Sequence, residues 1–172
     1  ALFAEAERVG LVPFSTPFDA AAVDFLETLD PAAHKIASFE LVDLALIRRA
    51  AATGRVVIMS TGMATAPEID EAVAAARSAG AAGVVLLRCN SAYPAPADEM
   101  DLRTIPDMAD RWSVPVGLSD HTLGSTAAIT SVALGACVLE KHLTLARSDG
   151  GPDAAFSLEP HELALLVEQV RE

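Results

Sequence analysis

The chain has 172 residues, 52% of them hydrophobic and 21% charged, which is typical of one globular domain over residues 1–172 with a sizeable core. Its formal net charge of −12 argues against a nucleic-acid partner or an anionic membrane surface. Cys89 and Cys137 lie in apolar runs and are too few for a disulfide framework, which indicates reduced core residues in a cytoplasmic protein.

Short apolar runs alternate with amphipathic segments along the chain. The runs that predict strands cover residues 11–16, 34–38, 55–61, 83–89, 114–120 and 136–142. Helical periodicity covers residues 19–29, 41–53, 66–79, 100–111, 124–134 and 160–171. The sequence TAPE at 65–68 predicts a capping box, and Gly54, Gly80 and Gly135 stand where helices are expected to end.

This alternation predicts βαβ units and a parallel sheet. A doubly wound sheet is the alternative, but no glycine-rich dinucleotide loop follows any of the strands. Polar residues stand at the carboxyl end of nearly every predicted strand, where a (β/α)8 barrel builds its active site. We therefore expect an α/β fold of the (β/α)8 TIM-barrel type, incomplete at about six units, with two units missing upstream.

Two histidines close consecutive predicted strands, His121 in GLSDH and His142 in LEKH. Neighbouring strands lie about 4.8 Å apart, so two imidazoles at their ends can share one divalent metal ion. In that case Asp120 and Glu140 are expected to fix the tautomers of the two rings. From spacing alone, two separately hydrogen-bonded histidines remain an equal alternative.

Several hydroxyl groups and one lysine fall at or just past strand ends, where they suit a phosphate or a carboxylate. The alternative is that the hydroxyls only cap the helices that follow. Asp153, in the glycine- and proline-rich loop at 149–162, is either presented to a ligand or starts a turn. The strand-end set is Thr16, Lys35, Ser38, Ser60, Thr61, Ser91 and Ser119.

Motifs along nearly the whole chain resemble the catalytic barrel of the sialic acid synthase family. In order they are FSTPFD, KIASFEL, STGMAT, CNSAYPAP, VGLSDHT, GACVLEKH and GGPDAAFSLEP. The last motif is similar to the pseudaminic acid branch, because Ala154 stands where the N-acetylneuraminic acid branch tends to have a histidine.

The resemblance implies that phosphoenolpyruvate condenses with the open-chain aldehyde of an acetamido sugar, giving a nine-carbon 2-keto acid and phosphate. In the pseudaminic acid branch the sugar is 2,4-diacetamido-2,4,6-trideoxy-altrose. The alternatives are an N-acetylneuraminate or legionaminate synthase, and an inactive truncated fragment or binding module. A Schiff-base aldolase is disfavoured, because Lys141 stands between a glutamate and a histidine.

The resemblance also implies roles for individual residues. His121 and His142 match ligands of a divalent metal, manganese or alternatively magnesium or cobalt, which would polarise the aldehyde. Together with Lys35 and Glu140, these histidines form the expected catalytic set. Positions around phosphoenolpyruvate are matched by Lys35, Thr16, Ser38, Ser91 and Ser119, and those around the sugar by Tyr93, Glu140 and Asp153.

Lys141 alternates with Glu140 and His142, so it is expected on the opposite side of their strand. There we expect it to balance a carboxylate such as Glu40 rather than to touch substrate.

The family's first two strands, with a glutamate and a lysine, have no counterpart here, and neither has its C-terminal antifreeze-like domain. We therefore expect a fragment of the catalytic barrel of a homodimeric enzyme.

Overall fold

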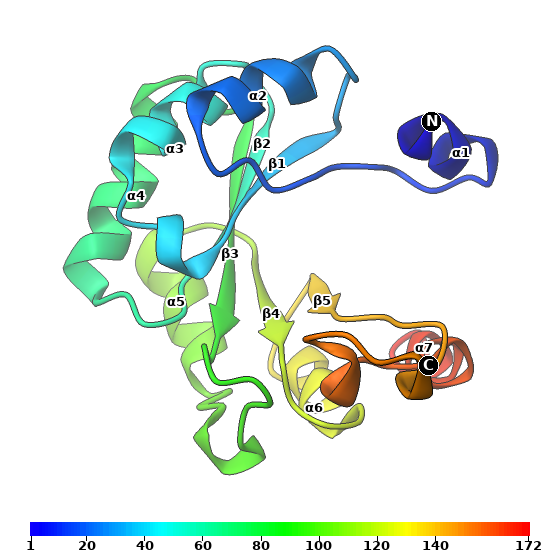
Figure 1. Ribbon diagram of the computed structural model, residues 1–172. Coiled ribbons are helices and arrows are strands. Elements are labelled where there is room, and N and C mark those ends of the chain that lie inside the picture. The colour runs from blue at the N-terminus through cyan, green and yellow to red at the C-terminus, as the bar shows by residue number, and fades with distance from the viewer. The chain divides into compact units, whose positions relative to one another are not determined.

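The computed structural model describes all of residues 1–172, which form two compact units, residues 1–85 and 86–172 (Figure 1). In each unit parallel strands alternate with helices, which confirms the α/β class predicted from the sequence. None of the helices combines the length and the apolar character needed to cross a membrane. The expectation of a single catalytic domain over residues 1–172 stays a prediction.

The first unit holds two paired strands and four α-helices. β1 and β2 run parallel, with Lys35 opposite Ile58; α3 contacts β2, and α4 contacts α3. The predicted capping box is confirmed, since the backbone N–H of Thr65 donates to Glu68 Oε2 at 2.7 Å. The elements are α1 (Leu2–Arg8), α2 (Ala20–Glu27), β1 (Ala33–Ile36), η1 (Ser38–Glu40), α3 (Leu44–Ala51), β2 (Val56–Ser60) and α4 (Ala66–Ser78).

The apolar run at 11–16 was expected to be a strand, and that prediction is wrong. It makes only one isolated parallel bridge, between Ser15 and His34. Pro13 has no N–H to donate to a neighbouring strand, and Val12 and Phe14 are exposed instead of packed in a core. The chain therefore has five strands where six were predicted.

The second unit contains the other strands. β3 (Gly83–Cys89) begins in the first unit and ends in the second, where it pairs parallel with β4, and β4 pairs parallel with β5. In Figure 1, α6 (yellow) lies beside β4, and α6 also contacts α7 (red). The remaining elements are η2 (Ala97–Glu99), α5 (Thr104–Trp112), β4 (Val116–Asp120), α6 (Thr126–Ala133), β5 (Leu139–Lys141), η3 (Arg147–Asp149), η4 (Ala154–Phe156) and α7 (Pro160–Gln169).

A glycine brings β4 very close to the chain that leads into β5. A Cβ atom on Gly117 would stand 2.2 Å from the carbonyl oxygen of Val138, so only glycine fits. The neighbouring N–H of Leu118 donates to that same oxygen at 2.8 Å. This close approach fixes the register in which the carboxyl ends of β4 and β5 meet.

The cysteines only partly match their prediction. Both are free thiols, and Cys89 is buried at the end of β3. Cys137 is exposed, because it precedes the short strand β5 instead of lying within it.

Candidate active site

The carboxyl ends of β4 and β5 bring most of the predicted catalytic side chains of the second unit together. The register pairs Ser119 with Glu140 and Asp120 with Lys141. Because side chains alternate along a strand, these two pairs lie on opposite faces of the sheet. On the first face Ser119 Oγ donates to Glu140 Oε1 at 2.6 Å.

His121 follows β4 and is buried, and the contacts that hold its ring are made by Nδ1. Its Nδ1 lies 2.8 Å from the backbone oxygen of Asn90 and 3.9 Å from Cys89 Sγ. Because a carbonyl oxygen only accepts, Nδ1 carries the hydrogen, and the lone pair of Nε2 remains available for a ligand. Burial opposes protonation, but the hydrogen bonds with Cys89 and Asn90 and the nearby charges of Cys89 and Glu140 together outweigh burial and raise the pKa of His121.

His142 follows β5, and its ring centroid lies 5.4 Å from that of His121. Its Nδ1 is 3.6 Å from Oδ2 of Asp153, which is the predicted loop residue. Burial lowers the pKa of His142, and the nearby charge of Asp153 opposes that shift. The structure therefore brings both predicted histidines, Glu140 and Asp153 into one neighbourhood.

Two further rings complete this neighbourhood. Tyr93 lies 4.2 Å from His121 between ring centroids, and burial raises the pKa of its phenol, which therefore stays protonated. Phe156 is buried, with its centroid 4.9 Å from that of His142 and 6.1 Å from that of His121. Phe156 was not among the residues predicted for the site, and its only signal in the sequence is its place in the motif GGPDAAFSLEP.

Some predicted partners are wrong. Asp120 does not contact a histidine ring; its Oδ2 accepts from Lys141 Nζ at 2.8 Å. Lys141 does balance a carboxylate on the opposite face, as predicted, but that carboxylate belongs to Asp120 and not to Glu40.

The tautomer of His121 is fixed by the backbone oxygen of Asn90 and not by Asp120, and Glu140 accepts a hydrogen bond from Ser119. Backbone atoms have no sequence signature, so the role of Asn90 could not be predicted.

The two histidines fit a shared metal ion only in part. The hydrogen bond from His121 Nδ1 to Asn90 leaves Nε2 as the ligating atom, which is how metal-bound histidines are usually held. No group of three or more His, Cys, Asp or Glu side chains is arranged to hold an ion. Two imidazoles with the other positions left to water and substrate are the donor set that the chain offers.

The first unit carries its own polar cluster on β1 and β2. Lys35 is buried, and its Nζ donates to Ser60 Oγ at 2.7 Å and to the backbone oxygen of Ile36 at 2.9 Å. Ser38, in η1, and Thr61, just after β2, are also buried. Thr16 is half-buried beside Ser15, whose oxygen accepts from the N–H of Lys35 at 3.0 Å. Lysine and hydroxyl groups thus gather at these two strand ends, as predicted.

Ser91 lies just after β3 in the second unit. Its Oγ is buried and has no hydrogen-bond partner in the structure. Since a buried hydroxyl without a partner is costly, this atom is suited to accept or donate a bond to a ligand.

Comparison with known proteins places these features in a family. The model described as NeuB family matches residues 1–172. The chain is 40% identical to N,N'-diacetyllegionaminic acid synthase of Campylobacter jejuni, over 99% of this chain and 52% of that protein. It is 39% identical to pseudaminic acid synthase of Helicobacter pylori, over 99% of this chain and 50% of that protein.

Among solved structures, the N-acetylneuraminic acid synthetase of Leptospira borgpetersenii matches with a TM-score of 0.96 at 34% identity, over 99% of this chain and 59% of that one. This likeness confirms the fold class expected from the sequence, α/β of the (β/α)8 barrel type. The chain spans about half the length of the curated relatives described above.

Proposed function

The chain belongs to the NeuB family, and on that premise we propose that it acts as a phosphoenolpyruvate-dependent synthase of a nonulosonic acid. The methylene carbon of phosphoenolpyruvate forms a bond to the aldehyde carbon of an open-chain acetamido sugar. Water then adds to the former enol carbon, and the phosphate leaves, giving a 2-keto acid. The observation that carries the proposal is the meeting of His121 and His142 beside the Ser119–Glu140 pair at two adjacent strand ends.

Within this class we propose pseudaminic acid synthase, acting on 2,4-diacetamido-2,4,6-trideoxy-altrose. Ala154 after Pro152 and Asp153 supports this choice, because the N-acetylneuraminic acid branch tends to carry a histidine there. The alternative substrates are the precursors of N-acetylneuraminate and legionaminate.

We propose that His121 and His142 hold a divalent cation, manganese or alternatively magnesium or cobalt. When bound, this ion supplies Lewis-acid charge for the aldehyde oxygen of the sugar. The protein's own contribution is orientation: Asn90 leaves Nε2 of His121 free to ligate, and Phe156 packs against both imidazoles. Rings fixed in this way lose little freedom when a ligand arrives.

The sugar is proposed to contact Glu140, Tyr93 and Asp153. Ser119 holds the Glu140 carboxylate by a 2.6 Å hydrogen bond, so one carboxylate oxygen stays in place to accept from a sugar hydroxyl. Tyr93 and Asp153 are exposed enough to meet a substrate beside the same histidines.

Phosphoenolpyruvate is an anion, and we propose that it is bound by the residues that the family resemblance assigns to it. These are Lys35, Thr16, Ser38, Ser91 and Ser119. Lysine and hydroxyl groups donate to phosphate and carboxylate oxygens, and a fixed anion cannot drift from the carbon it must attack. We also propose that the enzyme is a cytoplasmic homodimer.

The test is phosphate release from phosphoenolpyruvate by the full-length protein, with each of the three candidate sugars in turn. We expect release to depend on the altrose sugar, and Glu140→Gln to lower kcat by about 100-fold or more. Glu168→Gln, on the exposed last turn of α7, is the matched control and should match the wild type. Turnover of N-acetylmannosamine instead would move the chain to the sialic acid branch, and no turnover of any sugar would contradict the proposal.

A further inference from the structure

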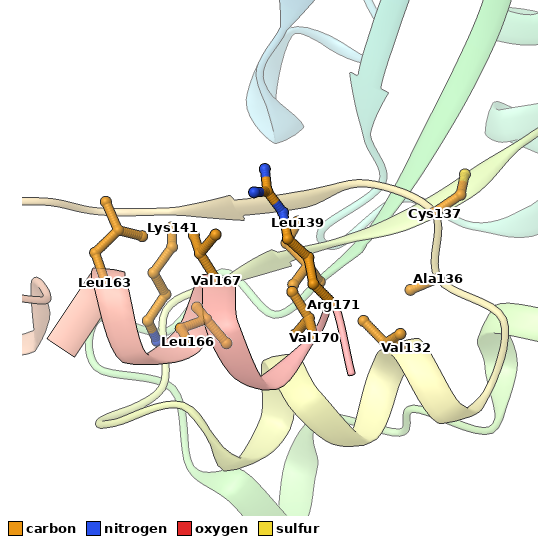
Figure 2. A pocket seen from close by; sticks show the side chains of 10 residues that line it. All are labelled: Val132, Ala136, Cys137, Leu139, Lys141, Leu163, Leu166, Val167, Val170 and Arg171. Atoms are coloured by element: carbon orange, nitrogen blue, oxygen red, sulfur yellow. The ribbon is translucent and has the colours of Figure 1, made fainter.

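The face of β4 and β5 that points away from the histidines carries a buried ion pair. Lys141 Nζ lies 2.8 Å from Asp120 Oδ2, and the two side chains are 4% and 1% exposed. Lys141 also lines a cavity of about 400 Å³ with residues of α6 and α7. Figure 2 shows its side chain extending from β5 toward the α7 residues that line this cavity, among them Leu166.

This ion pair is part of a closed set of hydrogen bonds around one residue. Lys141 Nζ also donates to the backbone oxygen of Thr122 at 2.5 Å. Asp120 Oδ1 accepts from the backbone N–H of Thr122 at 2.8 Å. The residue between Asp120 and Thr122 is His121, whose own carbonyl oxygen accepts from the N–H of Ala95 at 3.0 Å. The backbone on both sides of His121 is therefore tied down.

The same lysine precedes His142 in the chain, so one side chain connects the backbones that carry both imidazoles. We propose that Lys141 is a positioning residue, which ties Thr122 to the end of β5 and so holds His121 and His142 in one relative arrangement. Its partner in this role is Asp120.

Stability alone does not explain such a pair. A buried ion pair can often be replaced by apolar side chains of similar volume without loss of stability, because desolvation offsets the attraction. What the apolar replacement cannot supply is the bond from Nζ to the Thr122 oxygen. Lysine suits the position better than arginine because its compact ammonium has three donors on one atom, and two of them serve two acceptors here.

The experiment compares the full-length wild type with the double variant Asp120→Leu/Lys141→Met. Long-range 1H–15N correlation spectra of histidine-labelled protein report the tautomer of each imidazole. We expect a single Nδ1–H tautomer for His121 in the wild type, and loss of that single state in the double variant. His34 and His161 are internal references and should not change.

Kinetics provide a second readout, which rests on the proposed function. We expect the double variant to lower kcat about 10- to 100-fold, as loss of residues that orient a ligating histidine does, with KM for phosphoenolpyruvate nearly unchanged. Arg171→Met is the control, because Arg171 lines the same cavity without belonging to the hydrogen-bond set. If the wild type turns over no sugar, the proposed function fails while the spectra still decide the positioning role.

A folded double variant that keeps the single tautomer and the wild-type kcat would overturn the proposal, since charge balance would then be the pair's whole role. A neutral wild-type His121 whose single ring proton is on Nε2 would overturn it too. If the apolar pair fails to fold, Asp120→Asn/Lys141→Met keeps an acceptor for the Thr122 N–H and still removes the donor to the Thr122 oxygen. That variant is held to the same criteria.

Discussion

The two faces of the β4–β5 strand ends have different chemistry, although their residues alternate within a few positions. One face carries Ser119, Glu140 and the two histidines, and it opens on exposed residues such as Tyr93 and Asp153. The other carries Asp120 and Lys141, which are almost fully buried and bonded to each other, and Lys141 lines a cavity with residues of α6 and α7.

The two faces show how a short strand can place residues for ligand binding on one side and residues that position them on the other. Residues that are proposed to meet a ligand, such as His121 and Glu140, lie on the face that also holds the exposed side chains of Tyr93 and Asp153. Residues that only position them need their hydrogen bonds made inside the protein, as at Lys141, where two of the three donors have protein acceptors. Alternation along β5 separates the two requirements without any additional element.

The largest expected effect is a change that damages both faces at once. Gly117→Ala would place a Cβ atom 2.2 Å from the Val138 oxygen and push the chain before β5 away from β4. We expect a loss of about 3 kcal/mol in the free energy of unfolding, as for severe overpacking. Urea denaturation measures this loss of stability.

Gly83→Ala is the matched control, because its Cβ would meet nothing nearer than Val56 at 3.8 Å. Equal stability of the two variants would contradict the close approach.

A smaller effect should fall on the histidine face alone. Phe156→Leu keeps an apolar side chain but removes the ring that packs against both imidazoles. We expect a loss below about 1.5 kcal/mol in stability, together with a drop in kcat, because His142 loses its packing partner. Thermal unfolding and steady-state kinetics separate the two. A drop in stability at unchanged kcat would show that Phe156 only fills space.

Ser119→Ala tests one hydrogen bond on the same face. Without the 2.6 Å bond from Ser119 Oγ, the Glu140 carboxylate is no longer held. A hydrogen bond to a charged group contributes about 1.5 kcal/mol, so we expect kcat/KM for the sugar to fall about tenfold. Ser78→Ala, whose hydroxyl donates to the backbone oxygen of Ala75 in α4, is the control. Equal kcat/KM values for both variants would argue against a role for Glu140 at the sugar.

The smallest effect concerns an ion pair that is exposed rather than buried. Hydrogen bonds from Arg147 and from the Glu159 backbone lower the pKa of Glu162 to about 2. Because the folded pKa lies below the unfolded one near 4.5, the contribution of Glu162 to stability is present above about pH 4.5 and is lost as the pH falls through about 2. The stability difference between the wild type and Glu162→Gln should therefore shrink over that window. A difference independent of pH would contradict the pKa shift.

Much of the fold could be predicted because the spacing of apolar residues and the residues that begin and end helices are local features of the sequence. The helix start at Thr65 and the helix ends at Gly54, Gly80 and Gly135 follow from side-chain chemistry a few residues away, and all three glycines have positive φ angles. The run at 11–16 is apolar but contains Pro13, which has no N–H to donate to a neighbouring strand. An apolar run becomes a strand only where it pairs along its length with a neighbouring strand, and that pairing is a property of the whole sheet.

The candidate site was predictable in its residues but not in its pairs. His121, His142 and Glu140 stood out because polar groups at strand ends are unusual in apolar runs. Which carboxylate meets Lys141 depends on the register of β4 against β5, and a shift of one residue would have changed the partner. The buried contact of His34 Nε2 with Glu27 at 2.9 Å likewise depends on how α2 packs on β1.

The most direct test of the central claim is a manganese titration of the full-length protein, followed by electron paramagnetic resonance. We expect one site per chain, which is lost in His121→Ala and in His142→Ala and kept in His161→Ala, whose imidazole is exposed. Binding that survives in either of the first two variants, or no binding by a folded wild type, would contradict the claim that these two strand ends share one ion.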